Sequence, residues 1–328
     1  MGKEISAPSL FQLGYYWDAK IFLVSVKLDL YTALSDGPKF SDEVSELLKT
    51  DPAFTKRLLS ALVVIGVITC DDDRYANTAV VAEFLVKTSP FYMGELMLLQ
   101  DAEWAAWGKL EDIVRSGHPT MTGHLFMNRP DLGAMTLNVL NRMGQRIAPS
   151  LAEKIDLSAY RSFLDVGGGA GTFSIAFCKR YPNLAGVLFD LPQTLPTTRK
   201  NIEKEKMEDR ITLSGGDFNK DILPNPCDVV FLSDILHYQT YDENQALFHK
   251  LYEATNLSGT IIVKDMFLGD DNAPGWNAIF SMHMMVYSQN GQCFKDSEIR
   301  RWLTHAGFRE IQEIEHNTVL IAKKSPQI

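Results

Sequence analysis

The sequence predicts an α/β protein with a Rossmann-like, doubly wound sheet, preceded by a helical domain of winged-helix outline. Two observations predict the sheet: a glycine-rich loop joins an apolar strand to a helix, and several later apolar strands each end in a polar residue. A third observation predicts the first domain, where helical patterns precede a short β-hairpin pattern near the start of the chain.

The amino-terminal part begins with helical patterns. Apolar residues at helical spacing predict a helix over 21–34, which the breaker cluster Asp36-Gly37-Pro38 ends. Asp51 is a helix-capping residue followed by proline at the first helical position. A second helix is therefore expected over 52–65, with Gly66 as its stop.

Two short strand patterns, 67–70 and 75–77, flank the turn Asp71–Arg74 and complete the winged-helix outline. A winged helix often binds DNA, but three aspartates form the tip of this wing and its surroundings are acidic. Phosphate contact requires the opposite charge, so we expect no nucleic acid as partner. The first helices carry more apolar surface than one small domain can cover, which predicts a homodimer.

Residues 89–160 read as a helical connector. Trp104, Trp107 and Leu110 are expected to share one helix, and a Gly/Pro/Met-rich loop follows at Gly117–Pro130. A further helix then places three apolar residues on one face, namely Met135, Val139 and Met143. Methionines of this kind fill cores, but they also form adaptable walls for apolar ligands.

The central motif is a strand–loop–helix–strand unit. Phe163–Val166 is the first strand, Gly167–Gly171 the loop and Thr172–Arg180 the helix, and a second strand, Val187–Phe189, stops at Asp190. Glycines allow a ligand to approach the backbone closely, at dihedral angles that side chains disfavour. An acid about 20 residues on, at the end of the second strand, is placed to bind ribose hydroxyls.

The spacing of this loop favours a particular kind of ligand. Three residues past Gly169, where a dinucleotide fingerprint has glycine, this chain has Thr172. Asp165 instead lies two residues before the first glycine. An acid beside the loop suits a cationic ligand and would repel a pyrophosphate. Together with Asp190, the motif indicates a nucleoside-type cofactor that carries positive charge.

The later strands bring polar side chains to the same edge of the sheet. The strands expected here are 211–214, 228–232 and 260–263. The residues that follow them are Asp217, Phe218, Ser233, Asp234, His237, Lys264 and Asp265. An open α/β sheet binds ligands at the carboxyl ends of its strands, so these side chains are site candidates. A final hairpin, 310–315 and 318–323, is expected to close the sheet with an antiparallel strand.

Composition narrows the classes of function. A net charge of −9 argues against nucleic acid or an anionic membrane as partner. The longest apolar run is far short of a membrane span, and no signal peptide is visible. The four cysteines lie far apart without metal-ligand spacing, which predicts reduced thiols, a cytoplasmic protein and no metal site.

With these motifs in place, nearly the whole chain, roughly 10–324, resembles the class I small-molecule O-methyltransferases of the caffeate and hydroxyindole type, including bacterial members. The stretches that carry the resemblance are LDVGGGAGTFS, VLFDLP, GGDF, DVVFLSDILHY and AGF at Ala306–Phe308. The resemblance implies S-adenosylmethionine as methyl donor and a methyltransferase sheet over a swapped-helix dimer. The expected domains are a dimerisation domain (1–88), a connector contributing to the substrate pocket (89–160) and a catalytic domain (161–328).

The resemblance also implies roles for individual residues. It places a histidine base at His237, with Asp265 as the carboxylate that orients it. The residues assigned to the cofactor are Asp165, Gly167, Gly169, Asp190, Leu191, Asp217, Phe218 and Ser233. The residues assigned to a small, aromatic or apolar acceptor are Trp104, Met143, His283 and Cys293.

Several positions depart from the family pattern. The family follows its histidine with Asp-Trp, whereas this chain has Tyr238-Gln239. Cys293 occupies the place of a second glutamate, and Ser233 that of a lysine. Transfer to sulfur or carbon, or a repurposed member without methyl transfer, therefore stays open beside transfer to oxygen. A ligand-responsive winged-helix regulator is the alternative from another class, and the acidic wing argues against it.

Overall fold

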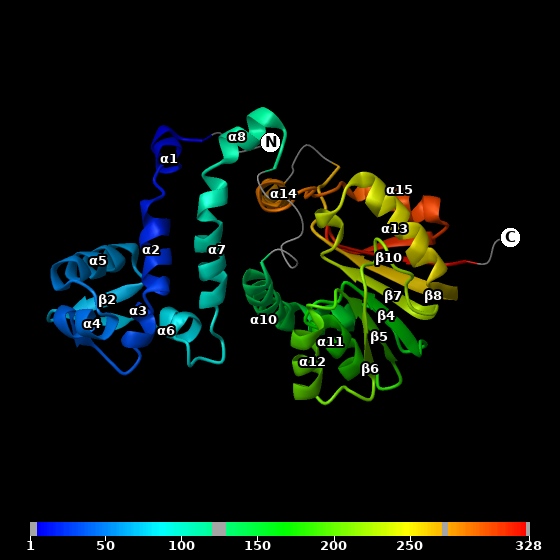
Figure 1. Cartoon of the computed structure of the whole chain (residues 1–328), viewed down its shortest axis with the longest axis horizontal. Helices are drawn as coiled ribbons and strands as arrows, with labels where there is room; N and C mark the ends of the chain where they lie inside the picture. Colours follow the sequence, from blue (N-terminus) through cyan, green and yellow to red (C-terminus); the bar gives the residue numbers. More distant parts are fainter. Residues whose placement is uncertain (1–4, 120–128, 271–274, 326–328) are drawn as a thin grey trace. The chain divides into compact units, whose positions relative to one another are not determined.

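The computed structural model describes residues 5–119, 129–270 and 275–325. The chain divides into two compact units, Met1–Ala105 and Ala106–Ile328, and each is described here by itself (Figure 1). The division into three segments at 88 and 160 remains a prediction.

The first unit packs short helices around a small sheet. Its elements are α1 (Ala7–Gln12), α2 (Trp17–Lys27), α3 (Leu30–Ala33), β1 (Lys39–Phe40), α4 (Ser41–Leu48), α5 (Pro52–Ile65), β2 (Ile68–Asp71), β3 (Arg74–Asn77), α6 (Ala79–Leu85) and most of α7 (Gly94–Trp107). Leu30, Leu59 and Leu62 are fully buried in its core. The predicted second helix is confirmed, because the Asp51 side chain caps it and Gly66 ends it at a φ of 87°.

The wing is confirmed as an antiparallel hairpin of β2 and β3. Asp72 and Asp73 at its tip have φ of 44° and 59°, so both adopt the left-handed conformation that two-residue hairpin turns require. The sequence missed β1, a two-residue strand that pairs with β3 on the other side.

Two helix predictions were wrong in extent. The helix predicted over 21–34 is two helices, because Asp29 adopts a left-handed φ of 62° and turns the chain so that Leu30 and Tyr31 enter the core. The helix predicted through Leu110 ends at Trp107, and Leu110 begins α8 (Leu110–Ser116). Gly108 lies in the turn between them, where the lack of a side chain weakens helix continuation.

The second unit is a seven-stranded sheet in the order β6-β5-β4-β7-β8-β10-β9. Its strands are β4 (Ser162–Val166), β5 (Ala185–Asp190), β6 (Ile211–Gly215), β7 (Cys227–Ser233), β8 (Thr255–Lys264), β9 (Arg309–Glu315) and β10 (Val319–Lys323). Its other elements are α8, α10 (Pro130–Lys154), α11 (Thr172–Arg180), α12 (Leu195–Lys204), η1 (Leu236–Tyr238), α13 (Tyr241–Glu253), α14 (Gly275–Tyr287) and α15 (Asp296–Ala306).

Helices cover both faces of this sheet, as the doubly wound prediction requires (Figure 1). On one face α10, α11 and α12 pack on the strands, and on the other face α13 and α15 do so. β4 is parallel to both β5 and β7, so the winding changes direction beside β4. Ligands of open α/β sheets bind at such a point, beyond the carboxyl ends of the strands.

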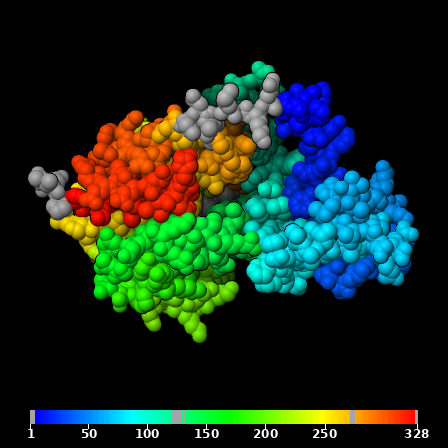
Figure 2. Space-filling model, turned by 180° about the vertical axis from the view of Figure 1, so that it is seen from behind, coloured from blue at the N-terminus to red at the C-terminus, as the bar shows by residue number. Residues whose placement is uncertain are grey.

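The closing hairpin is also confirmed. β10 is antiparallel to both β8 and β9. β6 and β9 are the outer strands of the sheet. On the surface of the second unit, the red carboxyl-terminal segment and the green segment accordingly lie on opposite sides (Figure 2).

Within the described ranges, no helix combines the length and the apolar character that crossing a bilayer requires.

Candidate active site

The glycine loop after β4 is built from left-handed backbone. Gly167, Gly169 and Gly171 have φ of 69°, 52° and 79°. A Cβ on Gly167 would lie 2.3 Å from Cδ1 of Ile235 and 3.8 Å from Cε1 of Phe218. The loop is therefore a cradle that only glycine permits, with an aromatic ring beside it.

Asp190 ties the end of β5 to this loop. Its Oδ2 accepts a hydrogen bond from the Gly169 N–H at 2.7 Å, and its Oδ1 accepts one from the Leu191 N–H at 2.6 Å. The structure thus brings together Gly167, Gly169, Asp190 and Leu191, all assigned to the cofactor from the sequence.

Asp165 lies beneath the loop and is only 2% exposed. A Cβ on Gly168 would be 2.7 Å from its Cγ, and its Oδ2 accepts a hydrogen bond from Ser174 Oγ at 2.5 Å. Burial raises the pKa of this carboxyl to about 7, opposed by the Ser174 hydrogen bond and reinforced by the charge of Asp190. Its Oδ1 has no hydrogen-bond partner among the residues the structure describes. Asp165 therefore supports the loop from below, and its contact with a ligand remains a prediction.

Helix α12 holds the carbonyl side of the loop. Thr198 Oγ1 donates to the Gly169 carbonyl at 2.6 Å, and Asn201 Nδ2 donates to the Ala170 carbonyl at 2.9 Å. Sequence reasoning missed both residues. Their spacing of three along a helix was the available signal, since it puts two polar side chains on one face.

Asp217 and Phe218 follow β6, as predicted, and the Phe218 ring lies beside Gly167. Lys250 of α13 fixes this turn, because its Nζ donates to backbone carbonyls there. The acceptors are those of Phe218 at 2.9 Å, Asn219 at 3.2 Å and Asp221 at 3.2 Å. No sequence pattern pointed to Lys250.

Substitution of Gly167 tests the cradle. Gly167→Ala should weaken binding of S-adenosylhomocysteine, because the new methyl group meets Ile235 and strains a left-handed backbone. Gly117→Ala is a matched control, since Gly117 has the same φ of +69° and, among the described residues, no atom beyond its chain neighbours lies within 4 Å of its Cβ position. Both variants should lose about 1–2 kcal/mol of stability, but titration calorimetry should show lost affinity only for Gly167→Ala. Equal affinities for the two variants would contradict the cradle.

At the ends of β7 and β8, Ser233 and Lys264 are register partners. Ser233 Oγ donates to Asp234 Oδ2 at 2.8 Å, and Lys264 Nζ lies 2.6 Å from the same oxygen. The Asp234 N–H also donates to the Lys264 carbonyl at 2.8 Å. The sequence predicted Lys264 at this edge of the sheet but not its ion pair with Asp234. That ion pair joins the ends of β7 and β8, the strands that precede His237 and Asp265 in the chain.

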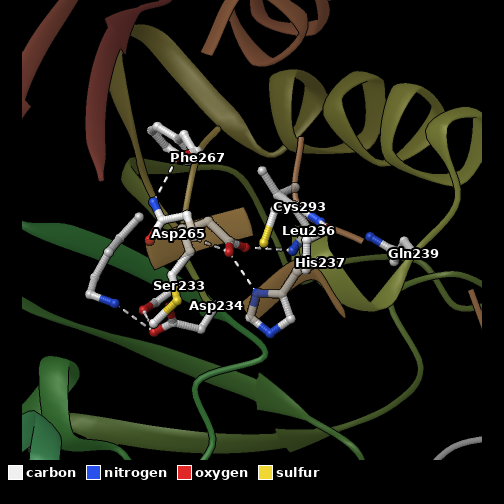
Figure 3. Close-up of polar contacts among 12 residues, drawn as sticks. Ser233, Asp234, Leu236, His237, Gln239, Asp265, Phe267 and Cys293 are labelled. Carbon is white, nitrogen blue, oxygen red and sulfur yellow. Dashed lines mark hydrogen bonds and ion pairs between the residues drawn. The ribbon is translucent and has the colours of Figure 1, made fainter. Parts of the chain in front are cut away.

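His237 and Asp265 form a buried pair (Figure 3). Nδ1 of His237, which is 4% exposed, lies 2.6 Å from Oδ1 of Asp265. Oδ2 of Asp265 accepts the Leu236 N–H at 2.9 Å, so one carboxylate holds both the ring and the backbone before it. Figure 3 shows the second ring nitrogen of His237 pointing away from Asp265.

Burial alone would lower the pKa of His237, but the charge and hydrogen bond of Asp265 raise it above its ordinary value. The adjoining histidine in turn lowers the pKa of Asp265, against the effect of burial. Asp265 therefore stays ionised, and a proton taken up at the other ring nitrogen of His237 is stabilised by the neighbouring charge.

Aromatic rings extend from His237 along α14. The ring centroid of Phe280 lies 5.2 Å from that of His237 and 5.7 Å from that of His283. His283 also stacks on Tyr287 at 5.5 Å and on Trp107 at 6.3 Å. Burial, together with the charge of His237, lowers the pKa of His283. His283 is thus a neutral imidazole among aromatic rings, close to His237.

The other residues assigned to the acceptor have different surroundings. Cys293 is buried near Asp265, and burial raises the pKa of its thiol to about 12, so the thiol is neutral. Met143 is exposed on α10. Trp104 belongs to the first unit, where its ring contacts Tyr16 and Lys20. Contact of these residues with an acceptor remains a prediction.

A seven-stranded doubly wound sheet with a glycine cradle, anchored by an acid at the end of the next strand, is an arrangement that binds nucleoside cofactors. Two family matches agree: residues 107–309 match the O-methyltransferase domain, and residues 11–87 match the O-methyltransferase dimerisation domain. The chain belongs to this O-methyltransferase family and is an S-adenosylmethionine-dependent small-molecule methyltransferase.

Similar curated proteins differ in the atom they methylate. The chain is 28% identical over 304 residues to the tetracenomycin polyketide synthesis 8-O-methyl transferase TcmO of Streptomyces glaucescens, covering 90% of this chain and 89% of that protein. It is 30% identical over 311 residues to 3-hydroxy-5-methyl-1-naphthoate 3-O-methyltransferase of Streptomyces sahachiroi, covering 91% and 88%. It is also 27% identical to the N,N-dimethyltransferase OxyT of Streptomyces rimosus, covering 92% and 91%. The L-tyrosine C(3)-methyltransferase of Streptomyces lavendulae is likewise 27% identical, with 86% and 81% covered.

Among solved structures, PigF with SAH superposes with a TM-score of 0.90 at 25% identity, covering 98% of this chain and 100% of that chain. An O-methyltransferase family protein from Burkholderia thailandensis gives the same TM-score of 0.90 and identity of 25%. The methyltransferase fold therefore extends over nearly the whole chain.

Proposed function

We propose that this enzyme transfers the methyl group of S-adenosylmethionine to a hydroxyl of a small aromatic acceptor, with His237 as general base. The observation that carries the proposal is the buried His237–Asp265 pair, with Nδ1 of the ring 2.6 Å from the carboxylate. That contact orients the ring and directs its other nitrogen away from Asp265 (Figure 3).

The cofactor, when bound, supplies an electrophilic methyl group on a sulfonium. Asp190 and the glycine cradle fit its ribose and amino-acid parts, and the Phe218 ring beside Gly167 suits its adenine. A phenol has a pKa of about 10 and is mostly neutral at pH 7. Removal of its proton by His237 makes the oxygen a stronger nucleophile for in-line attack on the methyl carbon. General base catalysis of this kind raises the rate by about 10²–10⁴-fold.

The ring contacts of Trp107, Phe280, His283 and Tyr287 support an aromatic acceptor. Flat rings favour offset stacking with other rings, which orients an acceptor as well as retaining it. The O-methyltransferase relatives that act on polyketide and naphthoate compounds point to acceptors of this kind.

Transfer to nitrogen, carbon or sulfur is the second candidate. Tyr238, Gln239 and Cys293 replace residues of the usual acid–base pattern, and relatives include an N- and a C-methyltransferase. A mass-spectrometric screen with methyl-labelled S-adenosylmethionine distinguishes the candidates. Phenols, amines, thiols and unsubstituted aromatic rings are offered in parallel, and label found only on carbon, nitrogen or sulfur would refute hydroxyl transfer.

We further propose that the protein is a homodimer whose interface includes the start of the chain. Exposed apolar residues are dense there, and they include Leu10, Phe11, Leu13, Tyr15, Tyr16 and Trp17. Exposed patches of this kind mark association surfaces, and the family match over 11–87 is a dimerisation domain.

Substitution of this surface tests the interface. Phe11→Ser combined with Trp17→Ser should shift the protein toward monomer at micromolar concentration, because buried aromatic side chains contribute most to an interface. Val64→Ser is the control, since Val64 is also exposed but lies on α5 and should leave the dimer intact. Multi-angle light scattering measures the outcome, and an unmodified protein that is already monomeric would overturn the proposal.

A further inference from the structure

The segment that carries His237 is held from two sides. On one side Asp265 binds both the imidazole and the Leu236 N–H. On the other side Asn244 of α13 donates from Nδ2 to the Leu236 carbonyl at 3.0 Å. Both peptide groups of the residue before His237 are therefore fixed by buried side chains.

Asn244 is an unusual choice for its position. It is 0% exposed and lies inside a helix, where asparagine is a poor former. Both ends of its amide are used, because its Oδ1 accepts from Gln239 Nε2 at 2.8 Å. A well-packed apolar residue would suit a buried helical site better, so a role in holding η1 explains the amide.

The side chain of Gln239, which donates to Asn244, also points to a positioning role. It is also buried, and its Oε1 has no hydrogen-bond partner within the described part of the chain. Leaving a buried acceptor unpaired costs about 1–3 kcal/mol. Stability alone therefore does not explain Gln239, whereas its contact with Asn244 orients the amide that grips Leu236.

We propose that Asn244, oriented by Gln239, is a positioning residue that sets the contact of His237 with Asp265 through the peptide groups of Leu236. The expected loss of turnover rests on the proposed function, in which His237 is the base. The expected shift in the titration of the His237 imidazole does not, because it is the same whichever atom receives the methyl group.

Loss of this grip should weaken the imidazole–carboxylate contact and so shift the titration of His237. Among the described residues, the charged and titratable groups near His237 are Lys264 at the end of β8 and Asp265 after it, Asp234 after β7, His283 of α14, and Tyr238, whose ring centroid lies 4.6 Å from that of His237. Asn244 carries no charge, so replacing it alters none of their charges. A shift would therefore report a change in geometry.

The test uses Asn244→Leu, which preserves size but cannot donate or accept, in the full-length enzyme with S-adenosylhomocysteine bound. The His237 imidazole, labelled with ¹⁵N, should titrate about half a unit or more lower than in wild type. kcat should fall by about ten- to a hundredfold, while the Kd of S-adenosylhomocysteine changes less than about twofold. Asn256→Ala, which removes an amide contact to Asp228 at the other edge of the sheet, should leave the titration unchanged.

Gln239→Leu provides a second variant that keeps the contact of Asn244 with Leu236 and should shift the titration in the same direction by less. It decides the question if Asn244→Leu does not fold. A His237 titration unchanged in the folded variants would overturn the inference. An active His237→Ala enzyme would refute the base, but not the positioning that the titration reports.

Discussion

His237→Ala should lower single-turnover methyl transfer to a phenol of high pKa by about 10²-fold or more, with the affinity for S-adenosylhomocysteine nearly unchanged. The variant loses the group that removes the acceptor proton. The glycine cradle and Asp190 lie on other strands and stay intact. The loss should shrink for an acceptor that is already anionic, because no proton then has to be removed. Equal rates for wild type and variant with both acceptors would refute the base.

The pH profile follows from the same pair. A base acts in its neutral form, so turnover should fall as the pH drops through the pKa of His237, which Asp265 holds above the ordinary 6.5. Asp265→Asn removes the charge that raises this pKa, so the acid limb should move to lower pH. His283 is the alternative base to compare. Its pKa is lowered, so if His283 were the base, turnover would fall only at a pH below 6.5. If turnover by His237→Ala still fell with decreasing pH at values above 6.5, the assignment of His237 as the base would be contradicted.

Asp190→Ala should weaken S-adenosylhomocysteine binding on the order of 1.5–3 kcal/mol, or about 10- to 150-fold in Kd. The carboxylate fixes the N–H groups of Gly169 and Leu191, and we expect it to bind the ribose hydroxyls as well. Its removal therefore loosens the cradle and deletes a charged hydrogen-bond acceptor.

Asp228→Ala is the matched control for this prediction. Asp228 also accepts two backbone N–H groups, those of Arg161 at 2.9 Å and Ser162 at 3.0 Å, but it lies at the amino end of β7. Both variants should lose stability in thermal unfolding, while calorimetry should show lost affinity only for Asp190→Ala. Unchanged affinity in Asp190→Ala, or binding of a nicotinamide dinucleotide, would contradict the assignment of this site.

Local patterns in the sequence were enough for several elements. A run of glycines directly after an apolar strand allows the left-handed backbone of a cradle, and an acid at the end of the next strand lies beside it in a parallel sheet. Gly167, Gly169 and Asp190 therefore lie together as predicted. Asp51, Pro52 and Gly66 act on their own helix, so its bounds were also predictable. The break at Asp29 was not, because the burial of Leu30 and Tyr31 in the core decides it.

The sequence by itself determined the fold class, the glycine-rich loop and the presence of a histidine and an acid at one edge of the sheet. Only the tertiary structure decided that Asp165 lies beneath the loop and that Lys264 pairs with Asp234. It also decided that Lys250 and Thr198 hold loops far from them in the chain, and that Asn244 holds the carbonyl of Leu236 in η1. The physical reason is that a cap or a glycine turn acts within a few residues, so its signal is local. A hydrogen bond between segments depends on how the helices dock on the sheet, and no spacing in the sequence records that.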